Sequence, residues 1–409
     1  RGGVGLFTGR TPYVWLSNQY GNSGVDFTNL SVSYNVNNKV PFVADPNAQP
    51  ETVTGGATGR QTINVIDPDY KYPSVIRTNI GLDHDLGFLG LVGTAEVLYT
   101  KNVQEIYYQN LNYVPLSNLP DSRLTYQKKN TGLNDVMLLT NSAKGTAWQA
   151  AFKVERPFRN GWYASGSYLY GESRSVNDGT SSVARSNWSG APAGIDVNNP
   201  PLTQSNYSPG HRVNFAFSAQ VPMFAGLRST ASLYYNGQNG RPYSLGFNGD
   251  ANLDGVTNND LLYVPTGADD PRVTVYNGTW DQLMAYLNGD PSAQGNAGKI
   301  LARNTARAPW QNQMDFRYAI NLPAIGRARA EVTVDIINVL NLLNNDWGWQ
   351  YWADFPGLAR TIGYGGIDAA TGKMRYNLST ITSSTFQGTF VRDDLKSRWA
   401  AQLGARVRF

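Results

Sequence analysis

The chain has 409 residues, of which 34 are basic and 30 acidic, giving a net charge of +4. This near balance, without a basic cluster interleaved with aromatic residues, argues against nucleic acid as a partner. Cysteine is absent and histidine occurs twice, which excludes disulfides, thiolate chemistry and most histidine-rich metal sites. No apolar run approaches the roughly 18 residues that a membrane-spanning helix requires.

The first part of the chain predicts little regular structure after a short opening pair. Two extended runs, residues 2–9 and 13–18, lie on either side of a Gly/Pro turn. Residues 20–73 are rich in Asn, Gly, Thr and Pro, which predicts a long loop with brief strand-like pieces at 30–34 and 63–66. Because the chain begins at Arg1 without a leader segment, we expect it to be an incomplete or processed polypeptide.

Four hairpins follow, in which apolar and polar side chains alternate with period two. The period predicts strands with one apolar and one polar face. In the last hairpin, for example, Met314, Phe316 and Tyr318 face away from Asp315 and Arg317. The paired runs cover residues 75–83 with 91–99, 148–155 with 162–170, 212–221 with 227–235, and 314–322 with 327–336.

Short turns and long connections alternate strictly along the chain. The connections at residues 101–145, 171–209, 236–309 and 341–396 are long and polar. Such loops are unusual in compact soluble domains, but outer-membrane barrels combine short periplasmic turns with long extracellular loops. The count from the opening pair to the end is about eleven strands. The 24 Tyr, 10 Trp and 15 Phe suit the aromatic girdles of such a barrel. We therefore predict an all-β, antiparallel transmembrane β-barrel.

The closing strand carries the sharpest single signal. Apolar and polar residues alternate, and the chain ends on an aromatic side chain, as does the closing strand of bacterial outer-membrane barrels, which it resembles. By this resemblance the apolar residues form an assembly signal read by the barrel-assembly machinery. They include Trp399, Leu403, Val407 and Phe409.

Several segments resemble the C-terminal barrel half of TonB-dependent outer-membrane transporters, and most closely the Oar-like branch. They are residues 1–18, 91–101 (LVGTAEVLYTK), 335–344 (DIINVLNLLN) and the closing strand. That family has a barrel of about 22 strands filled by a plug domain. The resemblance implies that residues 1–409 are one incomplete barrel domain, about half of such a barrel. It also implies outer-membrane lipids, the protein's own plug and TonB as partners.

A candidate calcium site lies in the longest connection, residues 236–309. Asp250, Asn252 and Asp254, followed by Gly255, match the first half of an EF-hand-type loop, in which oxygen ligands surround Ca²⁺. The remaining candidate ligands are the Val256 carbonyl, Asn258 and Asp260. The twelfth position is Leu261 instead of Glu, so an ordinary Asn/Asp/Gly turn explains the pattern equally well. A calcium ion here would bind weakly, with a Kd on the order of 10⁻⁴ to 10⁻³ M, and would stiffen the loop.

Two further groups of residues allow more than one interpretation. Inward-facing charges on the last hairpin indicate either plug docking and a substrate path or, preferably, cross-strand ion pairs. Aromatic residues after residue 344 indicate either a ligand-facing patch or the outer membrane girdle. The charges are Arg317, Arg327, Arg329, Glu331 and Asp335, and the aromatic residues are Trp347, Trp349, Tyr351 and Trp352.

The sequence therefore predicts a receptor or transporter barrel in the bacterial outer membrane, with ligand captured by the extracellular loops. A structural or adhesive barrel without transport is the main alternative. A barrel enzyme is disfavoured because outer-membrane enzymes are usually small barrels. No Gly-x-Ser-x-Gly motif occurs, and we expect no catalysis. The substrate, the direction of transport and any accessory subunits are not readable from these residues.

Overall fold

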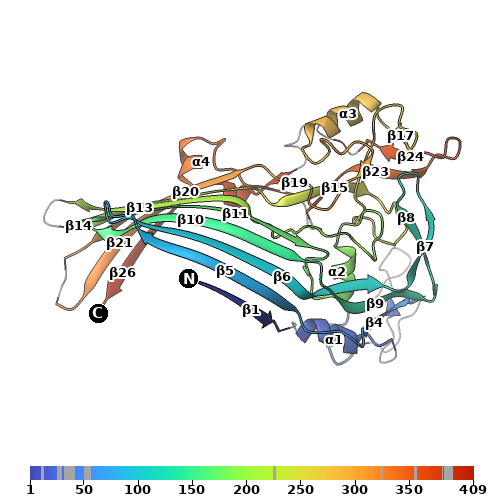
Figure 1. Ribbon diagram of the computed structural model, residues 1–409, viewed down its shortest axis with the longest axis horizontal. Coiled ribbons are helices and arrows are strands. Elements are labelled where there is room, and N and C mark those ends of the chain that lie inside the picture. Colours follow the sequence, from blue (N-terminus) through green and yellow to red (C-terminus); the bar gives the residue numbers. More distant parts are fainter. Residues whose placement is uncertain are drawn as a thin grey trace.

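The computed structural model describes residues 1–10, 13–24, 30–31, 42–49, 57–223, 227–323, 326–353, 357–379, 381 and 390–409. Within these residues no helix is both long and apolar enough to cross a membrane. Figure 1 shows two regions: long strands side by side, and a compact body at one end of them.

The long strands form one continuous antiparallel sheet of ten strands, called here the spanning sheet. In sheet order they are β1 (Gly2–Thr8), β5 (Ser74–Asp85), β6 (Val92–Asn110), β10 (Thr146–Arg159), β11 (Trp162–Ser175), β13 (Gly210–Pro222), β14 (Arg228–Gln238), β20 (Gln311–Asn321), β21 (Arg329–Ile337) and β26 (Ala400–Arg408). Every neighbour in space is also the next long strand in the chain, so the sheet is an up-and-down meander. All four predicted hairpins are confirmed.

The hairpin turns are short for local reasons. Between β10 and β11, Asn160 and Gly161 both have positive φ, the backbone that a two-residue turn of type I′ requires. Residues 224–226 and 324–325 in two other predicted turns lie outside the described residues. The strand ends that flank the four short turns lie at one end of the spanning sheet, together with the C-terminus (Figure 1).

The prediction of about eleven strands is wrong by one. Residues 13–18 belong to helix α1 (Tyr13–Gly21), not to a strand. Ser17 and Asn18 both donate side-chain hydrogen bonds to the Val14 carbonyl, and Trp15 Nε1 donates to the Ser181 carbonyl. Six residues are too few for period two to exclude a helix. Ten strands are not half of a barrel of about 22, so the strand count does not support the predicted half-barrel.

The spanning sheet is open in the described structure. β1 and β26 are its two edges and do not pair with each other, so the ten strands do not close a barrel. The register places most of the apolar side chains on one face, although Phe7, Val75 and Leu98 lie on the other. Thr78 on β5 lies opposite Val4 and Tyr99, and Val334 on β21 lies opposite Tyr318 and Leu403. The opposite face carries the polar and charged residues.

At the end opposite the short turns, the long connections fold into what we call the loop-end body (Figure 1). A five-stranded mixed sheet, in the order β17-β24-β23-β15-β19, forms its larger part. Its strands are β17 (Val273–Tyr276), β24 (Met374–Asn377), β23 (Leu358–Ile367), β15 (Pro242–Asn248) and β19 (Ala306–Arg307). Helix α3 (Trp280–Gly289) begins with a complete capping box between Thr279 and Gln282.

Shorter elements complete this end. They are β2 (Leu30–Ser31), β3 (Ala57–Thr58), β4 (Gln61–Ile66), β7 (Tyr113–Asn118), β8 (Leu124–Lys128), β9 (Leu133–Ser142), α2 (Ala184–Ser189), β12 (Thr203–Gln204), β16 (Tyr263–Val264), β18 (Lys299–Ile300), α4 (Val339–Leu343), β22 (Tyr351–Trp352), β25 (Val391–Arg392) and α5 (Asp394–Ser397). β4 confirms and extends the strand expected at 63–66, and pairs in parallel with β9. Only residues 30–31 of the piece expected at 30–34 are described.

The loop-end body contains two hydrophobic cores. The larger unites the third and fourth long connections and includes Tyr243, Phe247 and Leu262, all fully buried. The smaller unites the first two connections around Met137 and Trp188. The long, polar loops predicted from composition are therefore a packed structure, because apolar residues from separate connections converge in two shared cores.

Candidate functional site

The loop at residues 250–260, called here the aspartate loop, lies between β15 and β16 and joins the two cores. Ala251 belongs to the larger core and Val256 to the smaller. The bend between them is held by side chains: the amides of Asp254 and Gly255 donate to the Asp250 carboxylate at 3.1 and 2.9 Å. The φ of Gly255 is +81°, and the Tyr113 hydroxyl leaves no room there for a Cβ atom.

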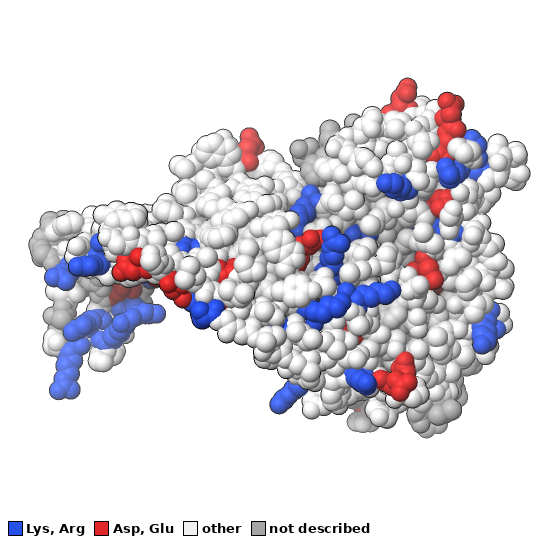
Figure 2. Space-filling model, in the orientation of Figure 1, with Lys and Arg blue, Asp and Glu red and all other residues white. Residues whose placement is uncertain are grey.

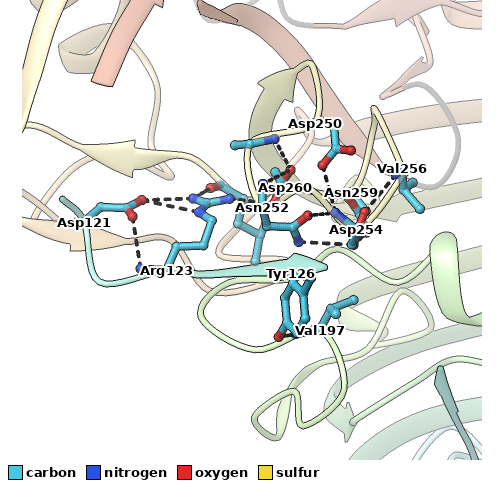
Figure 3. Close-up of polar contacts among 12 residues, drawn as sticks. Asp121, Arg123, Tyr126, Val197, Asp250, Asn252, Asp254, Val256, Asn259 and Asp260 are labelled. Atoms are coloured by element: carbon cyan, nitrogen blue, oxygen red, sulfur yellow. Dashed lines mark hydrogen bonds and ion pairs between the residues drawn. The ribbon is translucent and has the colours of Figure 1, made fainter. Parts of the chain in front are cut away.

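Asp254 is the buried centre of this loop (Figure 3). Its Oδ1 accepts a hydrogen bond from the Val256 amide at 2.8 Å. Its Oδ2 accepts from the side-chain amides of Asn252 and Asn259, at 3.1 and 2.8 Å. Burial, and then the negative charge of Asp260, raise the pKa of Asp254 to about 7. The carboxylate is therefore hydrogen-bonded but not neutralised by a cation.

The positively charged side chain of Arg123, which lies between β7 and β8, reaches into this site (Figure 3). Arg123 Nη1 lies 2.8 Å from Asp260, and Nη2 lies 3.2 Å from Asp121; all three side chains are fully buried. Nη2 also donates to the Leu261 carbonyl, and the guanidinium lies 5.3 Å from the centre of the Phe247 ring. Arg123 thus fastens the first long connection to the third.

The second long connection joins at the same place. The Ala193 amide donates to the Asn259 carbonyl at 2.7 Å. The Tyr126 amide donates to the Asn252 carbonyl at 2.8 Å, and the Tyr126 hydroxyl donates to Asp196 at 2.8 Å. Three connections far apart in sequence therefore meet at the aspartate loop, and its carboxylates hold the loop-end body together.

The side chains that converge in the aspartate loop agree only partly with the predicted calcium ligands. Asp250, Asn252 and Asp254 converge as expected, but Asn258 is part-exposed, and it is Asn259 whose amide meets Asp254. Asn259 Oδ1 is buried without a hydrogen-bond partner. Among the residues that the structure describes, no three His, Cys, Asp or Glu side chains lie close enough together to hold a metal ion. Calcium therefore stays a prediction, with Asn259 in place of Asn258.

The predicted charges of the last hairpin lie on the polar face of the spanning sheet, and some pair across strands. Arg317 on β20 lies 3.5 Å from Asp335 and 3.6 Å from Glu331, both on β21. Arg329 lies opposite Arg408 at the short-turn end, where basic side chains gather in Figure 2. Arg327 lies in the turn before β21. The structure favours ion pairing, because Arg317 bonds to its neighbours.

The residues of the predicted assembly signal lie along the edge strand β26. Leu403 and Val407 lie opposite Val334 and Ala330, on the apolar face of the sheet. Trp399 and Phe409 flank the strand. All four of these side chains, Trp399, Leu403, Val407 and Phe409, are exposed. The predicted alternation is confirmed, whereas recognition by an assembly machinery remains a prediction.

Sequence reasoning missed Arg123 and Asn259. Arg123 follows Asp121-Ser122 in a polar segment that looks like a solvated turn, so no sequence signal separates it from a surface arginine. Asn259 lies next to Asn258, and the EF-hand-like spacing selects Asn258, whereas the side-chain amide that meets Asp254 belongs to Asn259.

The sequence of residues 1–347 matches a protein-family model described as an outer membrane beta barrel domain. This agrees with the meander of long antiparallel strands, one face of which is apolar and exposed. The chain belongs to this family of outer-membrane barrels, and it is a protein of the bacterial outer membrane. No curated protein matches the sequence at a significant level.

Proposed function

We propose that this protein is the barrel part of a TonB-dependent receptor of the Oar-like branch. In this proposal the loop-end body captures a ligand at the cell surface, and a plug domain driven by TonB controls its passage through the lumen. The polar face of the spanning sheet would line that passage.

The observation that carries the proposal is the loop-end body itself. Barrels of the outer membrane place short turns in the periplasm and long loops outside the cell. By that rule the loop-end body faces the exterior. Unpacked loops would suffice for a barrel whose loops have no recognition task. Here the connections instead build two buried cores and a five-stranded sheet, and the buried Arg123 cross-links them. A rigid surface loses little conformational entropy when it binds a ligand.

Dependence on TonB is tested with the full-length natural protein in outer membranes. We expect it to cross-link to the periplasmic domain of TonB, and ligand-dependent growth to require both proteins. A protein that neither cross-links to TonB nor changes its phenotype when TonB is deleted would contradict the proposal. Cell adhesion that persists without TonB but is lost when residues 263–302 are deleted would favour the adhesive alternative.

We propose no catalytic role for this barrel. A hydrolase needs a nucleophile and a base within hydrogen-bonding distance. His211 instead bonds through Nδ1 to the Tyr168 hydroxyl at 2.6 Å and lies against the Tyr170 ring.

We also propose that a calcium ion binds in the aspartate loop and stiffens it. Burial, and then the repulsion of Asp260 and Asp250, raise the pKa of Asp254, and a divalent cation would offset that repulsion. Titration calorimetry at pH 8 should show calcium binding with a Kd on the order of 10⁻⁴ to 10⁻³ M. Asp254→Asn should abolish it, while exposed Asp269→Asn should not. No heat of binding with the unmodified protein would remove this proposal.

A further inference from the structure

An aromatic pocket lies on the apolar face of the spanning sheet, away from the aspartate loop. Its volume is about 440 Å³. Two of its residues come from the sheet, Tyr235 on β14 and Asn312 on β20, and Trp310 lies just before β20. The remainder come from the segment that begins with α4, which contacts β20 (Figure 1). They are Leu340, Asp346, Trp347, Gly348, Trp349 and Tyr351.

The strand register shows which way this pocket opens. Tyr235 lies opposite Met314, so its side chain is on the same face as Phe316, which lies two residues further along β20. Asn312 shares that face with Met314. The Tyr235 hydroxyl bonds to Asn312 at 2.6 Å, and the Trp310 ring covers Gly237 on the same side. This is the face that lipid covers in an outer-membrane barrel.

A second, polar pocket of about 180 Å³ adjoins the first, because Trp349 lines both. It contains two arginines. The Arg392 guanidinium lies 4.7 Å from the centre of the Trp349 ring, and Arg398 is largely exposed. Asp394 is 2.9 Å from Arg392 and 3.9 Å from Arg398, so the pocket keeps a surplus positive charge. The Asn345 side chain adds a hydrogen-bonding group, whereas the Asn341 amide is occupied by the carbonyls of Asn345 and Trp347.

The surrounding surface is typical of a membrane interface. Leu342 and Leu343 of α4 and the Trp347 ring are exposed to solvent in the isolated protein. Aromatic rings gather at the headgroup level of bilayers because one end is apolar and the other polar. The arginines lie beyond the loop-side end of β26, which is where headgroups of the outer leaflet would be.

We infer that these two adjoining pockets bind one phosphorylated glycolipid of the outer leaflet, with an acyl chain along the tryptophans and a phosphate on Arg392 and Arg398. A guanidinium binds phosphate through two parallel hydrogen bonds, and the aromatic pocket has the size of an ordinary ligand site. The inference rests on the outward orientation of the long connections but not on transport or TonB.

The test uses the full-length protein purified in detergent, with lipid A as the probe and native mass spectrometry as the readout. Wild type should bind diphosphorylated lipid A about tenfold more tightly than dephosphorylated lipid A, which is about 1.4 kcal/mol. Arg392→Gln and Arg398→Gln should each reduce this preference and leave binding of the dephosphorylated lipid unchanged. Trp349→Leu should weaken binding of both forms.

Matched controls are an arginine and a tryptophan that line neither pocket. Arg406→Gln changes an arginine of β26 on the polar face, and Trp148→Leu changes a tryptophan of the apolar face outside either pocket. Heat-modifiable electrophoretic mobility confirms that each variant is folded. Equal binding of the two lipid A forms would overturn the inference, as would equal losses in the controls. Equal affinity for phosphatidylglycerol, or a bound polypeptide that excludes lipid, would also overturn it.

Discussion

The spanning sheet and the loop-end body bury their apolar side chains in different ways. On the sheet, Leu82, Phe152 and Leu403 are 65%, 56% and 79% exposed. In the body, Phe247 and Leu262 are fully buried. The sheet therefore depends on lipid to cover its apolar face, whereas the body supplies its own cores. A surface receptor benefits from this division, because the part that meets the ligand keeps its shape in water.

The largest expected effect is on the body alone, from Arg123→Met. Loss of the guanidinium leaves Asp121 and Asp260 buried without a counter-ion, which costs about 3–5 kcal/mol. Urea titration followed by limited proteolysis should show cleavage in the long connections at lower urea, with the sheet still folded.

Arg317→Met is the matched control. It removes exposed cross-strand ion pairs, so the change should stay below about 1 kcal/mol. Equal losses in the two variants would mean that the body has no separate stability.

The body should also respond to pH through Asp254. The pKa of Asp254 is about 7 in the folded chain against the ordinary value of 3.8 for an aspartate, so the folded state holds the proton more tightly. Its stabilising contribution is full below about pH 4 and is lost as pH rises through about 7. The gap corresponds to roughly 4 kcal/mol at most.

The midpoint of urea unfolding of the body, measured from pH 4 to pH 8, checks this dependence. Asp254→Asn should flatten the profile, and exposed Asp269→Asn should leave it as in wild type. A midpoint that rises with pH in the unmodified protein would contradict the assigned direction.

The sheet should respond instead to charge on its apolar face. Phe152→Arg places a cation near the middle of β10 and should cost about 2–4 kcal/mol. The readout is the fraction of folded protein recovered in lipid vesicles. Ser165→Arg lies on the polar face opposite Glu155 and should be tolerated. If both variants assemble equally well, the assignment of the lipid face is wrong.

The smallest expected effect is local to α3. Thr279→Ala removes the N-cap and should destabilise the helix by about 1 kcal/mol. Amide hydrogen exchange should then accelerate in residues 280–289. Thr257→Ala changes an exposed threonine elsewhere in the body and should not alter this exchange. Unchanged exchange in Thr279→Ala would show that packing alone holds α3.

Sequence predicted the spanning sheet far better than the loop-end body. In each hairpin, two runs of alternating apolar and polar residues flank a short turn such as Asn160-Gly161. The local signals therefore agree with the fold. Strand β6 continues to Asn110, beyond the predicted end at residue 99, because its last third pairs with β9 in the body. Tertiary pairing of this kind has no local signature.

Part of the body could have been found from sequence. Thr279 and Gln282 form a capping-box pattern, and Leu283, Tyr286 and Leu287 follow at helical spacing. Strand β15 is different, because Tyr243, Leu245 and Phe247 alternate with Ser244 and Gly246 over only a few residues, and both faces are buried. In the candidate site the motif indicated Asp250 and Asp254 correctly, while Arg123 depends on long-range packing that sequence does not show.

The most direct test is to find which end of the spanning sheet lies outside the cell. The chain has no cysteine, so single cysteines report their own surroundings. In intact cells a membrane-impermeant maleimide should label Ala285→Cys on α3, and should label Arg159→Cys beside the β10–β11 turn only after the outer membrane is permeabilised. Labelling of Arg159→Cys from outside, with Ala285→Cys protected, would contradict the claim that the loop-end body is the cell-surface part of the protein.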